Sequence, residues 1–407
     1  MNNAQRTKKL TVTLTTAILA ACSAQALELP LTFISTNAPS IDFHGFLSQG
    51  LLASTDYNYL DSHSRDGSLQ YFEAGINASV NPFPHTRIAA QGFMFDVGNA
   101  GRYQPLLDYA SLEYTFNDYV GLRAGRIRKP GGIYNHIQDV DLARTWVLLP
   151  QSVYDARFRD LSCSLDGGEF FGNIPLSKAG SLSYEAYAGF TYASADSGLA
   201  KLIDNSLPGA ITKFDPITEA GGQLWWNTPV NGLRLGASLT EVLDFNYKFS
   251  APTGFPAPFD KVPLSAQSSI LLQQYSAEYI WKKWTFQAEV YDIQVSQDTI
   301  SPFGTTHSFS SDFAWYGGAA YRINNWMEAG GYYTEYHVNG TPVSGNPADK
   351  SQKDAALSLR FDPTAWWIFK VEGHYIRGTA LLSDNAANPV RNDNGWWMLA
   401  LKTTFSF

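Results

Sequence analysis

Cysteine, long apolar runs and positive charge are all scarce in this 407-residue sequence. It contains two cysteines, Cys22 and Cys163. If the chain is cleaved after Ala26, only Cys163 is left, so an intramolecular disulfide is excluded and Cys163 is interpreted as a small buried residue. Beyond residue 26 no apolar run reaches the ~18 residues of a membrane-spanning helix, which excludes that class of membrane protein.

The charge balance excludes one class of partner. The chain carries 29 Lys and Arg against 37 Asp and Glu, a net charge of −8. Loss of residues 1–26 removes Arg6, Lys8 and Lys9 and no acidic residue, which makes the net charge −11 (−8 − 3). Because a strongly acidic protein repels nucleic acid, we expect no nucleic-acid partner.

Motifs for hydrolytic or metal chemistry are missing as well. Neither a G-x-S-x-G nor an H-E-x-x-H pattern occurs in the chain, which has seven histidines. Asp139 and Asp141 are two residues apart, but no further oxygen ligands follow at a metal-binding spacing. We therefore expect no catalytic residues, no metal site and no cofactor.

The N-terminal segment has the pattern of an export signal. Basic residues precede an apolar run at 10–21, and Ser23–Ala26 provides a small-x-small cleavage site. The sequence predicts a signal peptide at 1–26 and a short lead-in at 27–40. Leu19–Cys22 also fits a lipoprotein processing box, in which Cys22 would be acylated, and both interpretations place the mature protein outside the cytoplasm.

From residue 41 onward, short segments of alternating apolar and polar residues follow one another. Each is near the 9–11 residues, or slightly more, that a tilted strand needs to cross a bilayer. The sixteen predicted strands are Ile41–Ser54, Leu69–Asn81, Thr86–Val97, Leu106–Phe116, Tyr119–Ile127, Leu161–Ile174, Ser181–Thr191, Thr218–Thr228, Leu233–Phe245, Ser268–Trp281, Trp284–Val295, Asp312–Ile323, Trp326–Val338, Lys353–Asp362, Trp366–Thr379 and Gly395–Phe407.

The joins between these segments alternate between short and long. Tight turns such as Asn117–Asp118 and Lys282–Lys283 alternate with long polar segments such as 246–267 and 296–311. Aromatic residues make up 14% of the chain, as suits girdles at two membrane interfaces. The sequence therefore predicts an all-β, sixteen-stranded antiparallel transmembrane β-barrel at 41–407, with short periplasmic turns and long outer loops, in the bacterial outer membrane.

The alternation also predicts which side chains face the lumen. In the segment 366–379, Lys370, Glu372 and His374 alternate with aromatic and aliphatic residues. A Lys or Arg that faces lipid at mid-depth costs about 2–4 kcal/mol, so the charged side must face inward, and Arg360 is assigned to the lumen on the same ground. We expect this lining to be wet, around a bore too wide for side chains to fill.

The longest interruption of the pattern is Arg126–Asp160, which we expect to fold inward and narrow the bore. It is too long for an ordinary connection and too apolar for a disordered tail. Its charges, with Arg123 on the preceding strand, are predicted to favour anions. The predicted constriction residues are Arg123, Arg126, Arg128, Lys129, Arg144, Arg157 and Arg159, with Asp139, Asp141 and Asp155 as their acidic partners.

The loop itself holds six basic and four acidic residues, a local balance of +2. Remote acidic loops hardly reach it, because the Debye length in physiological salt is about 8 Å. Some of these charges are expected to pair, Arg144 with Asp139 or Asp141, and Asp139 could cap a short helix from Val140. Three loop aromatics are expected to pack the loop, with a sugar-binding track as the alternative: Tyr134, Trp146 and Tyr154.

Over its whole mature length the chain resembles the sixteen-stranded bacterial outer-membrane porins. The likeness rests on the third long join being the longest, on GLRAGRIRKPGGIY leading into it, and on an aromatic last strand that ends at Phe407. GRIRKPGGIYN and FDPTAWWIFKVEGHYIRG are similar to the phosphate-selective porin superfamily, although that family's dense series of lumen arginines and lysines is not evident here. The resemblance implies an eyelet formed by the third loop, a homotrimer, and a terminal Phe407 that the barrel-assembly machinery reads.

These observations predict a porin surrounded by outer-membrane lipid. It would form a water-filled channel for passive diffusion of small hydrophilic solutes, with a weak to moderate preference for anions, and it would not be an enzyme. Two alternatives stay open at this point. One is an outer-membrane barrel enzyme of the lipase or protease type, supported only by His44 and His374 on predicted strands. The other is a non-conducting structural barrel.

Overall fold

The computed structural model describes residues 39–407 apart from 99, 207–210, 251–262, 341, 343–344 and 383–386. The predicted signal peptide, the lipoprotein box and most of the predicted lead-in therefore lie outside the described residues. Among the residues described, no helix is long and apolar enough to cross a membrane.

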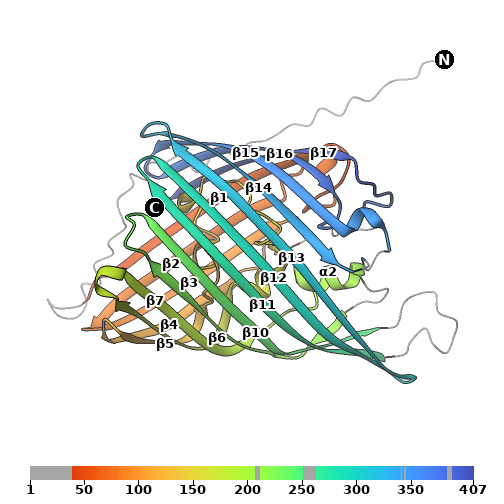
Figure 1. The fold of residues 1–407 in the computed structure, drawn as a ribbon, viewed down its shortest axis with the longest axis horizontal. Helices are drawn as coiled ribbons and strands as arrows, with labels where there is room; N and C mark the ends of the chain where they lie inside the picture. The colour runs from red at the N-terminus through yellow and green to blue at the C-terminus, as the bar shows by residue number, and fades with distance from the viewer. Residues whose placement is uncertain are drawn as a thin grey trace, which may run out of the picture.

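Strands dominate the described chain, and nearly all of them run diagonally around a barrel (Figure 1). They are β1 (Ile41–Ser54), β2 (Tyr71–Phe83), β3 (Thr86–Val97), β4 (Leu106–Asn117), β5 (Val120–Arg128), β6 (Ser164–Pro175), β7 (Ser181–Thr191), β8 (Ile211–Phe214), β9 (Ile217–Asn227), β10 (Leu233–Ser250), β11 (Pro263–Trp281), β12 (Trp284–Ser301), β13 (Gly304–Arg322), β14 (Met327–Asn339), β15 (Ser351–Thr364), β16 (Trp367–Gly378) and β17 (Gly395–Ser406). The helices are short: α1 (Arg159–Ser162), α2 (Gly198–Ser206), and the 3₁₀ helices η1 (Ser64–Asp66), η2 (Asn135–Ile137), η3 (Asp141–Ala143), η4 (Ala156–Phe158), η5 (Ser177–Ala179) and η7 (Pro347–Lys350).

Every strand pair is antiparallel, and the sheet closes on itself. β1 pairs with β2 on one side and with β17 on the other, with Phe46 opposite Ser406 at the seam. β9 pairs with the first part of β10 and β8 with its last part. β8 and β9 therefore occupy one strand position of the barrel. The predicted sixteen-stranded antiparallel barrel is confirmed. Closure leaves no sheet edge with unpaired backbone groups.

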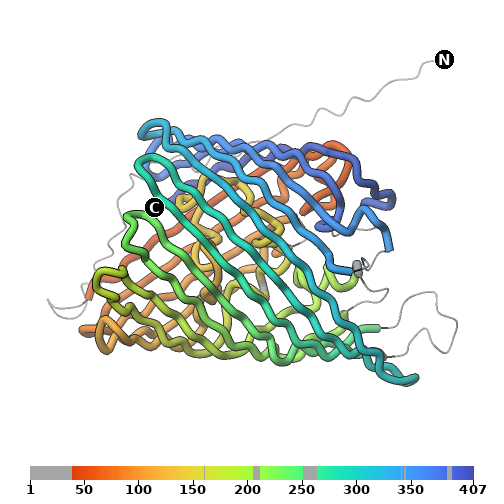
Figure 2. The backbone as a smooth tube through the Cα atoms, in the orientation of Figure 1, coloured from red at the N-terminus to blue at the C-terminus, as the bar shows by residue number. Residues whose placement is uncertain are grey.

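At one end of the barrel the joins are short, as between β2 and β3 at residues 84 and 85, and four strands are longer than expected. β10 to β13 contain 18 or 19 residues each and project beyond their neighbours in Figures 1 and 2. The predicted long loop 296–311 is therefore wrong, because β12 and β13 continue to the tight turn at Pro302 and Phe303. Ser and Thr dominate this hairpin, so it lacks the apolar alternation that marks the rest of the wall.

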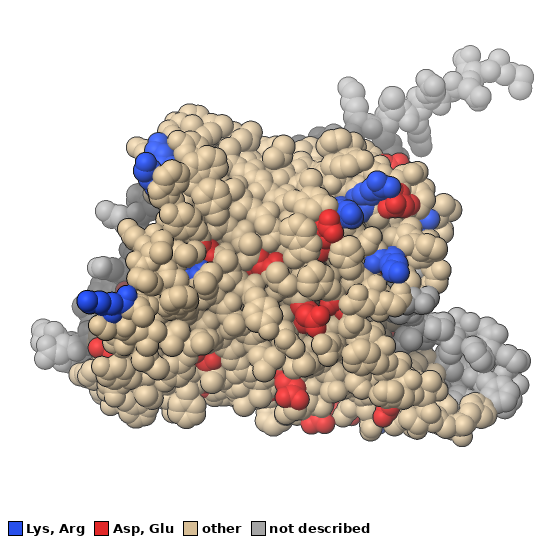
Figure 3. All heavy atoms as spheres, in the orientation of Figure 1, with Lys and Arg blue, Asp and Glu red and all other residues tan. Residues whose placement is uncertain are grey.

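The outer and inner faces of the barrel follow the predicted parity. On β17 the outward Trp397 and Leu399 are 60% and 41% exposed, whereas the inward Trp396 and Met398 are 0% and 3% exposed. The face shown in Figure 3 is accordingly mostly uncharged. Inward apolar side chains such as Trp396 are buried, so another part of the chain must pack against them inside the bore.

Candidate functional site

The join between β5 and β6 fills much of the bore. It runs from Lys129 to Cys163, three residues further along the chain than the predicted Arg126–Asp160, and carries η2, η3, η4 and α1. Figure 2 shows this segment inside the barrel rather than beyond its rim. We refer to residues 129–163 as the inner loop. Its hydrogen bonds reach strands on the far side of the bore.

Three glutamates of the wall hold the inner loop through its backbone and polar side chains. Glu289 of β12 accepts hydrogen bonds from the Ile133 amide at 2.9 Å and the Tyr154 hydroxyl at 2.5 Å. Glu372 of β16 accepts from the amides of Val147 and Leu148, both at 2.9 Å. The third, Glu219 of β9, pairs with Lys129 at 2.8 Å.

Each of these three carboxylates is at most 1% exposed. Buried carboxylates are tolerated only when their oxygens are hydrogen-bonded or paired, and the inner loop supplies those partners. The glutamates thus tie the loop to three separated parts of the wall.

A cluster of opposite charge anchors the loop near η3. The Asp141 carboxylate lies 3.3 Å from the Lys370 ammonium, 3.2 Å from that of Lys402 and 3.2 Å from the Arg144 guanidinium. Burial raises the pKa of Asp141, but the three positive charges outweigh burial and hold that pKa well below its usual range. Arg360 adds hydrogen bonds to the carbonyls of Leu142 and Arg144.

Asp139 is the centre of a second charge cluster. Its carboxylate accepts from Arg159 at 2.9 Å and from Arg128, and both guanidiniums also contact Asp108 of β4. Burial raises the pKa of Asp139, but Arg159 and Arg128 overcome this and keep the pKa far below normal. The predicted helix cap is wrong, since Val140 precedes η3 and no side chain caps it. The carboxylate is engaged by arginines instead.

Most of the predicted constriction cations are paired and covered. Arg144 binds Asp141, as one of the two predicted pairings has it, Arg157 binds Asp155, and Lys129 binds Glu219. All three cations are at most 8% exposed. They fasten the loop and do not present free charge to a solute.

Two of the predicted constriction residues on β5 lie on opposite faces of the barrel wall. Arg123 faces inward, where it bridges Glu113 at 2.9 Å and Glu169 at 2.9 Å. Arg126 pairs with Asp166 and alternates with Ile127, which is inward and 0% exposed, so Arg126 lies on the outer face and not in the lining. The prediction for Arg126 is therefore wrong.

The four predicted lumen residues of β15 and β16 do point inward, but they are not wet. Lys370, Glu372 and His374 are 0%, 0% and 1% exposed, and Arg360 is 5% exposed. The inner loop covers this half of the wall. The expected wet lining is wrong here, because strand parity says which face a residue occupies but not what packs against that face.

The loop aromatics serve packing, as expected. Tyr134 and Tyr154 are in edge-on ring contact with centroids 5.6 Å apart, and Trp146 contacts Tyr332 of β14 in the same way at 5.4 Å. The three loop rings are at most 8% exposed. Rings buried in this way present no face to a passing sugar. Cys163, at the end of the loop, is also buried.

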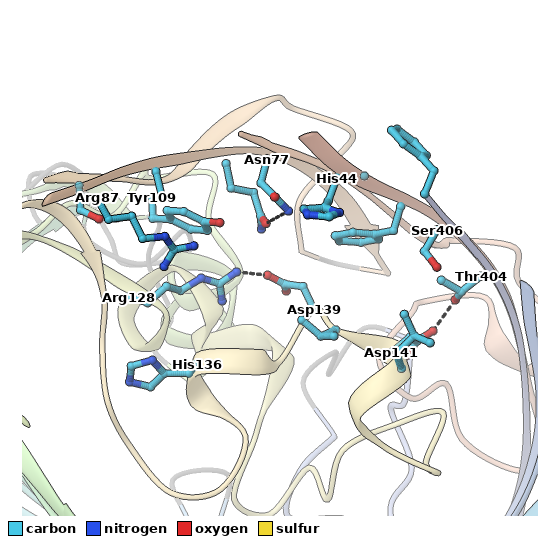
Figure 4. Close-up of a pocket in the computed structure, with 18 of the residues that line it drawn as sticks. His44, Asn77, Arg87, Tyr109, Arg128, His136, Asp139, Asp141, Thr404 and Ser406 are labelled. Carbon is cyan, nitrogen blue, oxygen red and sulfur yellow. Dashed lines mark hydrogen bonds and ion pairs between the residues drawn. The ribbon is translucent and has the colours of Figure 1, made fainter. Parts of the chain in front are cut away.

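A cavity of about 670 Å³ lies on the other side of the inner loop, against the wall formed by β1 to β5 and β17 (Figure 4). Arg87, Tyr109 and Arg123 line it from the wall, and His136, Asp139 and Asp141 line it from the loop. Figure 4 shows Arg128 joined to Asp139. Wall arginines therefore face loop carboxylates across the cavity.

Arg87 is one lining residue that sequence reasoning missed. It is exposed and, among the described residues, has no ion-pair partner. The parity of β3 could have identified it, because Arg87 is four residues before Gln91, which is inward and 6% exposed. A second cavity of about 580 Å³, at the short-turn end, shares Arg87 and Glu113 with the first, so the space continues to that mouth of the barrel.

Comparisons with known proteins identify the fold of the barrel. No protein-family model and no curated protein matches the chain. Among solved structures, in-vitro folded OmpT, an outer membrane protein of Vibrio cholerae, aligns with 13% identity and a TM-score of 0.55 over 92% of this chain and 99% of its own. The chain has the porin fold.

Two further solved structures share this fold. Salmonella typhi OmpF in complex with daunomycin aligns with 12% identity and a TM-score of 0.54, and the outer membrane channel DcaP of Acinetobacter baumannii with 10% identity and a TM-score of 0.53. Both alignments cover 92% of this chain and 99% of the other. At these identities, the similarity to the three structures establishes the porin fold of this chain and no more. Membership of the phosphate-selective subgroup stays a prediction.

Proposed function

We propose that this protein is an outer-membrane porin, a channel for passive diffusion of small hydrophilic solutes. The observation that carries the proposal is the cavity between the inner loop and the β1–β5 wall. It is lined by charged and polar side chains, lies inside a closed barrel, and continues to the short-turn end. A closed barrel with an apolar exterior and a narrowed polar interior suits selective passage through a bilayer.

The expected selectivity is a weak anion preference. Three arginines of the lining, Arg87, Arg123 and Arg128, face three carboxylates, Glu113, Asp139 and Asp141. Formal charge around the cavity is therefore balanced, which is less positive than the +2 expected for the loop alone.

One feature still favours anions. Arg87 is exposed in the lining and has no ion-pair partner in the described structure. One unpaired unit charge about 6 Å from an ion contributes about 0.3–0.7 kcal/mol after screening, or about a two- to threefold preference.

Reversal potentials across planar bilayers under a KCl gradient test this proposal. The native channel should conduct and favour chloride slightly, and Arg87→Gln should abolish that preference. Arg126→Gln is the matched control, because the same change on the outer face should leave selectivity unaltered. Absence of conductance would refute the channel, and unchanged selectivity in Arg87→Gln would refute the role of Arg87.

We also propose a homotrimer embedded in outer-membrane lipid and assembled by the barrel-assembly machinery after export. OmpT of Vibrio cholerae, which aligns with a TM-score of 0.54 and 13% identity, was solved in a trimer form. The exposed outward apolar residues of this chain provide surface for both lipid and subunits. Native mass spectrometry in detergent should give three chains per particle.

The barrel-enzyme alternative is not favoured by the geometry of His374. Its Nδ1 lies 3.0 Å from Asp354 and its Nε2 lies 3.0 Å from Glu372. Both ring nitrogens are therefore held by carboxylates, which leaves none to activate a serine or a water.

A further inference from the structure

Two buried carboxylates at the long-loop end of the barrel have no role in the proposed channel. Asp61 lies in the join between β1 and β2, and Asp96 lies near the end of β3. They are 3% and 2% exposed. Neither contacts the inner loop in any hydrogen bond or ion pair of the described structure, so a separate reason is needed for burying them.

The backbone brings the two residues together at Gly98. A Cβ on Gly98, whose φ is +57°, would come within 2.7 Å of the Asp61 Cα and 2.0 Å of the Leu60 carbonyl oxygen. Asp96 is two residues before that contact, and the charge of Asp61 acts on it. The first long join therefore packs its Leu60–Asp61 turn directly onto the start of the second.

One oxygen on each residue is left without a partner. The Oδ2 atoms of Asp61 and Asp96 are buried and, in the described part of the chain, accept no hydrogen bond. The rest of the Asp96 carboxylate has partners: the Arg102 amide donates to its Oδ1 at 3.2 Å, Tyr103 hydrogen-bonds to it, and Lys201 of α2 is close enough to act on it. The two Oδ2 atoms still lack a donor within the described structure. Burial of unsatisfied like charges is unfavourable, so this pair calls for a cation at the unpartnered oxygens.

We propose that Asp61 and Asp96 form a calcium site that ties the first long join to the second. Among the described residues no three acidic, histidine or cysteine side chains meet in a metal-binding group, so backbone oxygens and water complete the shell. Ca²⁺ accepts six to eight oxygen ligands in flexible geometry, whereas softer metals such as Zn²⁺ and Cu⁺ favour nitrogen or sulfur ligands that this site lacks. Sites of this low charge in extracellular modules bind with Kd of about 10⁻⁴–10⁻³ M.

Terbium luminescence on the chelator-treated, folded full chain tests the site directly. Tyr103 lies beside Asp96 and can sensitise a bound Tb³⁺. Emission should appear with the native protein and should be displaced by millimolar Ca²⁺. Asp61→Asn and Asp96→Asn should each weaken Tb³⁺ binding at least tenfold. Asp66→Asn, an exposed change in the same join, should bind as the native chain does.

A second measurement needs no variant. Ca²⁺ should slow proteolysis of the exposed 102–105 segment of the native protein, and Mg²⁺ at equal concentration should protect less. Tb³⁺ emission that is absent, or equal in all four proteins, overturns the proposal, as does cleavage that Ca²⁺ leaves unchanged. Neither readout depends on conductance, so the site can fail while the channel proposal stands, and the reverse.

Discussion

Neutralising Asp141 should loosen the inner loop more than any other single change of one charge. The Asp141→Asn substitution keeps the size of the side chain and removes the negative charge shared by Lys370, Lys402 and Arg144. Lys402 would keep Glu73 at 2.5 Å. Lys370 would keep only the carbonyls of residue 141 and Trp146, although it is 0% exposed.

The size of the effect follows from that buried, uncompensated lysine. Removing one partner of a buried ion pair costs about 3–5 kcal/mol. If this cost falls on the attached state of the loop alone, the equilibrium for local detachment shifts by roughly 10²- to 5 × 10³-fold, at a factor of ten per ~1.4 kcal/mol. The net charge around the cavity also becomes more positive by one.

Single-channel recording in planar bilayers is the assay. Asp141→Asn should raise mean conductance, add open-channel noise and increase anion preference. Asp166→Asn is the control, because Asp166 forms an ion pair with Arg126 at 3.3 Å on the exposed outer face, where such pairs are worth about 0–1 kcal/mol. Adding Lys370→Met to Asp141→Asn should quieten the channel again, since it removes the stranded charge.

Traces of Asp141→Asn that match those of Asp166→Asn in conductance and noise would refute the reasoning. So would a double variant noisier than the single one, since it would mean that Lys370 does not depend on Asp141.

Three other outcomes are expected. The folded state lowers the pKa values of Asp139 and Asp141. Their contribution to stability is therefore complete above the unfolded pKa of about 3.9 and is lost only as the pH falls through the lower folded pKa. Conductance should be constant from about pH 7 to 4, and channel opening above pH 5 would contradict this. Gly132→Ala places a Cβ 2.4 Å from the Tyr154 hydroxyl and 2.6 Å from Glu289 at φ +55°, so it should cost about 1–3 kcal/mol and add channel noise. Gly67→Ala, at φ +83° with nothing within 4 Å, should leave the recordings quiet. Burial raises the pKa of the Cys163 thiol, so maleimide should label the folded protein far more slowly than the denatured protein, and equal rates would show that the loop is not packed there.

Much of the barrel could be predicted because each strand separates two different environments. That separation imposes a period of two on the sequence, and it is legible in strands such as β16 and β17. It is not legible where both faces of a strand meet water. The outer part of the β12–β13 hairpin, rich in Ser and Thr, was for that reason predicted as a loop.

The candidate site was less predictable because its contacts join residues far apart in the chain. Glu372 accepts from Val147, 225 positions away, and nothing local to either residue marks that pairing. Composition indicated correctly that the loop, predicted at residues 126–160 and found at 129–163, would be packed. It could not say that most of the basic residues there would be neutralised by neighbours, or that Arg87, outside the loop, would be left unpaired.

The three glutamate attachments have a mechanical consequence. Glu219, Glu289 and Glu372 lie on β9, β12 and β16, which are well separated around the barrel. All three bind the inner loop. An empty barrel can flatten under lateral pressure. A loop that is attached to the wall at three separate points resists that change of shape. The inner loop would then set the roundness of the tube as well as its free aperture, so cutting it should make the cross-section more compliant even where the strands themselves stay intact.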